Sequence, residues 1–313
     1  MQLMNYEMSR GNLEVADTCC ASCGAAEVDD VELTECDGCD LVRYCSDECR
    51  EDHRTEHETK CKERAAELRD ELLFKQLEST HVGDCPICCL PLPIDHNKSS
   101  FYTCCGKAIC DGCAHADDTR QWEENRQQLT SCPFCRHIIP ETDEESNKNI
   151  AKRAKANDPG ALTQMGKIRC DEGDFDAAYE YFTKAAELGD ANAHYNLSIM
   201  YREGEGVEKD EKKQVYHFEE AAVRGHPDAR HFLGRYEVMN GRSDRAVKHF
   251  IIAANLGYNN SIKALKECYK HKVISKDCFA AALRAHHAAV KATKSPQRDA
   301  AEKCGWGRCD EPL

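Results

Sequence analysis

The sequence AAELG occupies residues 185–189 and returns in altered form as AAVRG at 221–225 and AANLG at 253–257. The steps between these copies are 36 and 32 residues. A second pattern repeats with similar steps, as Met165-Gly166, Leu197-Ser198, Leu233-Gly234 and Leu265-Lys266. A period of this size that contains two helical stretches predicts an α-solenoid, because each helix pair must stack on its neighbours to bury its apolar face.

The residue types of these repeats also favour paired helices. Alanine has high helix propensity and allows helices to approach closely, and the glycines that end each copy suit helix C-caps. The unit His194–Ala222 resembles a Sel1-like repeat, a relative of the TPR, through Tyr201, Gly204, Gly206-Val207 and Asp210. This resemblance implies an all-α superhelix over residues 158–291 that binds other proteins. The alternative, an ordinary helical bundle, does not explain a repeated period.

The length and charge of the chain limit the kinds of protein that it can be. Its 313 residues suit two or three domains, and its net charge of −14 is concentrated in residues 1–80, which hold 21 acidic and 9 basic side chains. An acidic front half repels phosphate, so we expect no nucleic-acid partner. No apolar run approaches the roughly 18 residues of a membrane span, and the polar start Met1–Arg10 shows no secretory signal. We therefore expect an intracellular protein, cytoplasmic or nuclear.

Cysteine is the most informative residue type outside the repeats. Seventeen of the 22 cysteines lie between Cys19 and Cys135. Disulfides need an oxidising compartment, whereas the recurring Cys-x-x-Cys spacing is typical of metal ligands. We therefore predict about four structural Zn²⁺ ions, because two groups of eight ligands complete four tetrahedra and leave no open coordination position.

The first group fills eight ligand positions in order, and it resembles a MYND zinc finger. This resemblance implies that the ligands interleave between two ions. The first ion then takes Cys20, Cys23, Cys45 and Cys49, and the second takes Cys36, Cys39, His57 and Cys61. Arg50 and Arg54 stand where the family usually has Gln and Trp, a departure at the family's groove for proline-rich peptides.

The second group resembles a RING finger made only of cysteines. The resemblance implies a cross-brace in which one ion takes Cys85, Cys88, Cys110 and Cys113, and the other takes Cys104, Cys105, Cys132 and Cys135. Lys107 occupies the usual His position, and a protonated lysine has no lone pair for zinc. We predict Cys104 as its replacement, with Cys89 as the fallback ligand.

The RING resemblance also implies a surface for a ubiquitin-conjugating enzyme. It would include Ile87 in the first Cys-x-x-Cys turn, Trp122, Pro133 in the last turn, and Arg136 directly after the eighth ligand. The alternative is that Ile87 and Trp122 form the small core of the domain. No catalytic nucleophile is assigned.

The sequence thus predicts a multidomain protein with two small zinc-stabilised cross-brace fingers followed by an all-α Sel1-like solenoid. The expected segments are an N-terminal tail (1–18), the first finger (19–61), a connecting helix (62–80), the second finger (81–139), a linker or exposed helix start (140–157), the solenoid (158–291) and a C-terminal tail (292–313). Two functions fit. The chain is a RING-type ubiquitin ligase whose solenoid holds partners or unknown substrates, or it is a non-enzymatic adaptor in which all parts only bind proteins.

Overall fold

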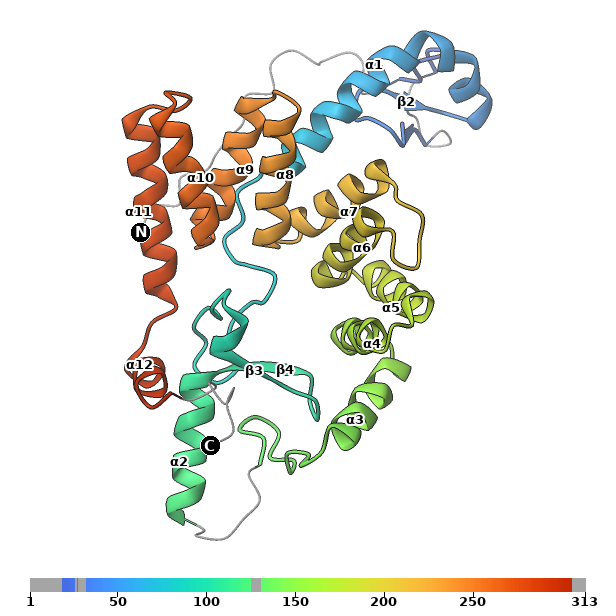
Figure 1. Cartoon of the computed structure of the whole chain (residues 1–313). Helices are drawn as coiled ribbons and strands as arrows, with labels where there is room; N and C mark the ends of the chain where they lie inside the picture. The colour runs from blue at the N-terminus through green and yellow to red at the C-terminus, as the bar shows by residue number, and fades with distance from the viewer. Residues whose placement is uncertain (1–18, 26, 28–31, 125–130, 306–313) are drawn as a thin grey trace. The chain divides into compact units, whose positions relative to one another are not determined.

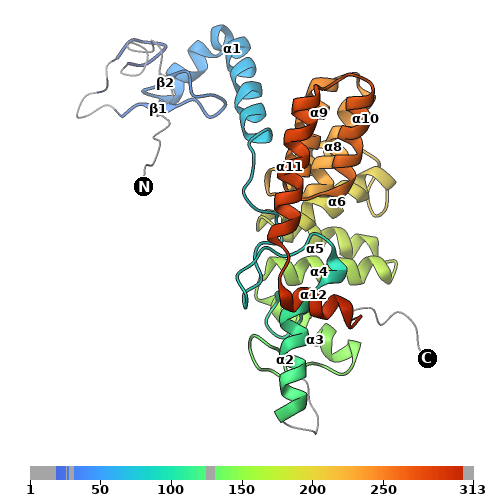
Figure 2. The ribbon, with the colours of Figure 1, turned by 90° about the vertical axis from the view of Figure 1, so that its left-hand side faces the viewer.

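The computed structural model describes residues 19–25, 27, 32–124 and 131–305. The chain divides into two compact units, at the boundary between Leu73 and Phe74, and each is considered by itself. Figure 1 and Figure 2 show the elements of both units in two views. None of the described helices is long and apolar enough to cross a membrane.

The first unit is a small finger that continues into one long helix. Strands β1 (Thr34–Glu35) and β2 (Arg43–Tyr44) pair antiparallel, and α1 spans Asp47–Leu73. Acidic residues in the first turn of α1 suit the positive end of the helix dipole. The expected connecting helix is therefore the second half of α1, which begins inside the first finger and ends at Leu73 rather than near residue 80.

The second unit begins with the second finger. Strands β3 (Ser99–Tyr102) and β4 (Lys107–Cys110) form a hairpin after the short 3₁₀ helix η1 (His96–Lys98), and α2 (Asp111–Glu124) follows directly. In the described residues, the main buried cluster of this finger consists of four cysteines together with Leu92 and Ile109. So small an apolar core cannot hold a domain of this size by itself, and it indicates that metal binding supplies much of the stability.

The solenoid consists of helix pairs that stack one on the next, as the repeat period predicts. Its helices are α4 (Pro159–Asp171), α5 (Phe175–Glu187), α6 (Ala191–Glu203), α7 (Glu211–Val223), α8 (Pro227–Met239), α9 (Ser243–Asn255), α10 (Asn259–Lys270) and α11 (Lys276–Ala292). The predicted C-cap glycines lie just beyond α5, α7 and α9 with positive φ angles, a conformation that glycine adopts without strain.

The repeat pattern explains how the two helices of a repeat pack together. Gly166 on α4 lies against the ring of Phe182 on α5, and Gly234 on α8 lies against the ring of Phe250 on α9 in the same way. A side chain at either glycine would collide with the aromatic ring. The upstream pattern seen in the sequence is therefore a packing contact between the two helices of one repeat.

Two helices flank the solenoid. Helix α3 (Asp143–Lys155), capped by Thr142, lies in the segment expected as a linker or exposed helix start, and it packs on α4. Its Arg153 guanidinium lies beside Gly106 of the second finger. Helix α12 (Pro296–Lys303) lies in the expected C-terminal tail and packs on α2 (Figure 1).

The segment that leads into the second finger is seated on the solenoid. The Phe74 ring lies 4.9 Å from the ring of His249. The backbone N–H of His81 donates to the carbonyl of Gly225 at 3.2 Å, and its ring stacks on His226 with centroids 4.3 Å apart. Because these contacts lie at the start of the finger and α12 follows the solenoid, the second finger is attached to the solenoid and to its flanking helix.

Candidate metal centres

Four groups of cysteine and histidine side chains come together in the described residues. Within each group every donor atom lies within 4.8 Å of the others. The groups have the memberships that the MYND and RING resemblances imply: Cys20, Cys23, Cys45 and Cys49; Cys36, Cys39, His57 and Cys61; Cys85, Cys88, Cys110 and Cys113; and Cys104, Cys105, Cys132 and Cys135.

The distances between donor atoms suit tetrahedral zinc. A Zn–S bond of about 2.3 Å places two sulfurs of a tetrahedron about 3.8 Å apart. The Sγ–Sγ distances are 3.6 Å for Cys23 and Cys45, 3.7 Å for Cys36 and Cys61, and 3.8 Å for Cys88 and Cys110. These separations are much too long for a disulfide, and all the cysteines of the four groups are free. The donor set of each group therefore fits Zn²⁺.

The first group is built from two short segments. Cys20 and Cys23 lie on a tight turn in which the Gly24 N–H donates to the Cys20 carbonyl at 2.9 Å. Cys45 precedes α1, and Cys49 lies in its first turn, with their sulfurs 3.6 Å apart. The segment just before α1 and the first turn of the helix thus each bring one thiolate toward the turn.

The second group uses the middle of the same helix. His57 and Cys61 are one turn apart on α1, and His57 Nε2 lies 3.3 Å from Cys39 Sγ. Burial lowers the pKa of His57, which keeps the imidazole neutral and able to donate a lone pair. A side chain at Gly38 would lie 2.9 Å from Cys61 Sγ, so the turn between Cys36 and Cys39 requires glycine.

His53, which is not one of the predicted ligands, packs on this group. Its ring stacks on His57 with centroids 5.6 Å apart, and its Nδ1 lies 3.0 Å from the hydroxyl of Tyr44. His53 is therefore a supporting residue of the first finger and not simply a solvent-facing one.

The second finger joins adjacent cysteines to one group. Cys104 and Cys105 lie in the loop between β3 and β4, where Gly106 has φ 66° and its N–H donates to Tyr102 at 2.8 Å. Their sulfurs lie 3.5 Å from Cys135 and 3.8 Å from Cys132, respectively. The exposed Cys89 lies outside the four groups.

The electrostatics of the thiol groups also favour a bound dication. A side-chain hydrogen bond from Cys110 is the main reason that the pKa of Cys85 falls to about 4, although burial opposes it. Burial, followed by interactions with neighbouring cysteines, raises the pKa of Cys61 to about 12. Four thiolates cannot ionise together at these separations unless a cation balances them, and zinc binding does so.

The residues expected to contact a partner have different exposures. Ile87 is 42 % exposed and Trp122 is 73 % exposed, so neither is part of a buried core. Pro133 is buried, whereas its neighbour Phe134 is 45 % exposed. Phe134 was missed by the sequence reasoning, although its place inside Cys132-Pro-Phe-Cys135 was a usable signal.

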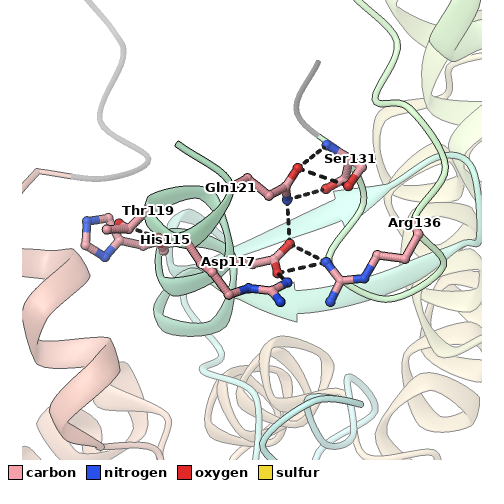
Figure 3. Close-up of polar contacts among 7 residues, drawn as sticks. His115, Asp117, Thr119, Gln121, Ser131 and Arg136 are labelled. Atoms are coloured by element: carbon pink, nitrogen blue, oxygen red, sulfur yellow. Dashed lines mark hydrogen bonds and ion pairs between the residues drawn. The ribbon is translucent and has the colours of Figure 1, made fainter. Parts of the chain in front are cut away.

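Arg136 is held against α2 by a polar network (Figure 3). Its Nη1 donates to both carboxylate oxygens of Asp117 at 2.8 Å. Burial alone would raise the pKa of Asp117, but hydrogen bonds from Arg136, Arg120 and Gln121 lower it, so this carboxylate stays ionised at neutral pH. Arg136 remains 53 % exposed, and its Nε and Nη2 have no partner among the described residues.

Gln121 fixes the last Cys-x-x-Cys turn to the same helix. Its side-chain oxygen accepts from the Ser131 N–H at 3.0 Å, and its side-chain nitrogen donates to the Ser131 carbonyl at 3.2 Å (Figure 3). This amide pairs with the backbone as a neighbouring strand does. The position of Arg136 is therefore set by α2 as well as by the metal ligands.

Comparison with known proteins identifies two modules. The family model described as a MYND finger matches residues 20–61, and the model described as a Sel1 repeat matches residues 161–190, 191–226 and 227–258. The chain thus contains a MYND finger and Sel1 repeats. Zinc-binding fingers joined to repeats of this type indicate a protein that binds other proteins.

Individual relatives match only parts of the chain. The protein named "Putative beta-lactamase HcpC" from Helicobacter pylori J99 is 41 % identical over 56 residues, which cover 18 % of this chain and 19 % of the relative. This chain therefore spans about a fifth of that protein.

Two solved structures resemble part of the chain. A Sel1 repeat protein from Oxalobacter formigenes is 30 % identical and has a TM-score of 0.43, over 49 % of this chain and 66 % of that one. The protective antigen c5321 from uropathogenic Escherichia coli is 22 % identical with a TM-score of 0.38, over 53 % of this chain and 37 % of that one.

Proposed function

We propose that this chain, which joins a MYND finger to a second cysteine finger and Sel1 repeats, is a RING-type ubiquitin ligase. The observation that carries this proposal is the interleaving of ligands in the second finger. The first and third cysteine pairs share one group, and the second and fourth pairs share the other. This is the cross-brace that the RING resemblance implies, and it leaves both zinc ions without an open coordination position.

The exposed residues of the second finger support a docking role. Ile87 and Phe134 lie on two different Cys-x-x-Cys turns and present apolar side chains to solvent. A turn stiffened by zinc loses little conformational entropy on binding, so such side chains can bury into a partner groove at low cost. The partner that we propose for this surface is a ubiquitin-conjugating enzyme.

Arg136 supports the same role through its remaining donors. Asp117 engages only Nη1, which leaves Nε and Nη2 to donate to a partner. In the proposed reaction a substrate lysine amine attacks the thioester carbon between ubiquitin and the conjugating enzyme, and the enzyme's thiolate leaves. Arg136 would hold the thioester in one conformation, and the ligase itself forms no covalent bond.

Autoubiquitination with a panel of conjugating enzymes tests this function. We expect activity in the full-length chain and its loss in Ile87→Ala and Arg136→Ala, both with zinc content unchanged. Met239→Ala, at an 83 % exposed residue of the solenoid, is the matched control and should keep full activity. If the unmodified chain shows no autoubiquitination with any enzyme of the panel, the proposed ligase activity is refuted. The adaptor function, in which the same surfaces only bind proteins, would then remain.

A further inference from the structure

We propose that Arg298, on α12, is part of the metal centre of Cys85, Cys88, Cys110 and Cys113, and that zinc binding there and docking of α12 stabilise each other. This residue lies 210 positions away from Cys88 in the sequence and outside every ligand motif. Its proposed role does not depend on ligase activity, because it concerns the metal and the helix alone.

The guanidinium of Arg298 contacts the segment from Cys88 to Pro91 with both terminal nitrogens. Nη2 lies 3.4 Å from the Cys88 sulfur and 3.2 Å from the Leu90 carbonyl, and Nη1 lies 2.7 Å from the Pro91 carbonyl. Nη1 also donates to the Thr293 carbonyl at 2.7 Å, which fixes the arginine on its own side. The planar guanidinium therefore connects Thr293, which precedes α12, to Leu90 and Pro91, which follow the ligand Cys88.

The charge of Arg298 needs a counter-charge, and among the described residues in contact with it the metal ligands offer one. The residue is 9 % exposed, and its partners in the described residues are carbonyl oxygens and the sulfurs of Cys88 and Cys110, with no carboxylate among them. A buried cation is costly unless an anion accompanies it. Four thiolates outweigh the two positive charges of one Zn²⁺, so the loaded centre is a buried anion in contact with this cation.

The backbone of α12 packs directly against the backbone of the finger. A side chain at Gly112, which lies between the ligands Cys110 and Cys113, would meet the backbone nitrogen of Arg298 at 2.6 Å. Ala301 is 1 % exposed, and Lys98 forms an ion pair with Glu302 at 3.1 Å. In both Figure 1 and Figure 2, α12 lies beside α2.

Hydrogen bonds to ligating groups from outside the coordination sphere commonly change metal affinity by about 10–100-fold. We therefore expect Arg298→Gln, which removes the charge but keeps a polar side chain, to weaken binding of one zinc ion by at least about tenfold. Arg298→Lys, which keeps the charge, should lose less. The binding affinity of purified full-length protein for zinc is measured by competition with a chromogenic chelator.

Arg284→Gln is the matched control, since Arg284 is exposed on α11 and makes no polar contact in the described residues. Far-UV circular dichroism should be the same for all variants. If Arg298→Gln binds all its zinc as tightly as Arg284→Gln does, the assignment is wrong.

Coupling must be reciprocal, so the helix should respond to the metal. In the unmodified chain, we expect removal of zinc by a chelator to abolish the hydrogen-exchange protection of the α12 amides while α5 and α6 keep theirs. Conversely, Ala301→Asp, which places a charge at a buried position of α12 and touches no ligand, should release one zinc ion more readily. Protection of α12 that survives zinc removal would overturn the proposal, even if Arg298→Gln failed to fold.

Discussion

Replacing Gly166 by alanine gives a sharp test of how the repeats pack. An alanine Cβ at this position would lie 2.5, 2.7 and 2.9 Å from three ring carbons of Phe182. Carbon atoms prefer separations of about 3.5–4.0 Å, so either the ring or the helix must shift by about 1 Å. The substitution therefore puts an extra methyl group into an interface that is already full.

The expected magnitude follows from two opposing effects. Overpacking a core costs about 1–3 kcal/mol, and three close contacts favour the upper part of that range. Alanine in place of glycine within a helix returns about 1 kcal/mol. We therefore expect Gly166→Ala to lower the free energy of unfolding of the solenoid by about 1–2 kcal/mol.

Gly160→Ala on the same helix is the matched control. The nearest atom to its Cβ would be a carboxylate oxygen of Asp158 at 3.5 Å, an ordinary contact, so this change should stabilise by about 0.4–1 kcal/mol. The two variants are compared by urea unfolding followed by far-UV circular dichroism. Adding Phe182→Leu to Gly166→Ala should restore part of the loss, because the smaller side chain makes room. If Gly166→Ala is as stable as Gly160→Ala, our account of the repeat interface is wrong.

Three further predictions concern the metal, the histidines and Arg136. Native mass spectrometry should find about four zinc ions per chain, and disulfide-bonded cysteines without metal would contradict the assignment. Removal of zinc by a chelator should unfold both fingers, because structural zinc in finger peptides contributes about 10–16 kcal/mol of apparent binding energy. Burial lowers the pKa of His194 and of His217 to about 4 from 6.5, so the unfolded chain binds protons more readily between these values. The free energy of unfolding should therefore fall as the pH drops from about 6.5 toward 4, and replacing His194 by Asn should flatten that slope in urea titrations; an unchanged slope would count against a neutral buried pair. Asp117→Asn should lower ubiquitin transfer about as much as Arg136→Ala while changing stability by no more than about 1 kcal/mol, because the pair is partly exposed; full transfer by Asp117→Asn would show that Asp117 does not position Arg136.

The repeats and the fingers could be predicted because their signals are local and periodic. The pattern at Met165-Gly166 and Leu233-Gly234 reflects one packing contact, between a glycine and a phenylalanine ring, that is found in two of the helix pairs. The ligand groups follow from fixed Cys-x-x-Cys turns, and their interleaving came from resemblance rather than from spacing. The structure also places Cys104, predicted to replace the usual His, in one group with Cys105, Cys132 and Cys135.

The role of α12 could not be predicted, because it depends on contacts that are remote in sequence. The segment PQRDAAEK is polar and has no apolar period, so its burial becomes evident only beside the second finger. A local signal did exist, since Ser295 caps the helix and Pro296 occupies its first turn. His286 on α11 is likewise buried, and its Nδ1 lies 3.2 Å from the carbonyl oxygen of Ala254 on a neighbouring helix.

The attachment of both flanking helices to the second finger changes how the repeats should come apart. An open repeat array melts from its ends, because a terminal repeat has only one neighbour. Here Arg153 of α3 lies beside Gly106 and Arg298 of α12 lies beside Cys88, so neither end is a free terminus. The second finger therefore connects the two ends of the array, and unfolding from either end requires the contacts between the finger and the flanking helix to break first.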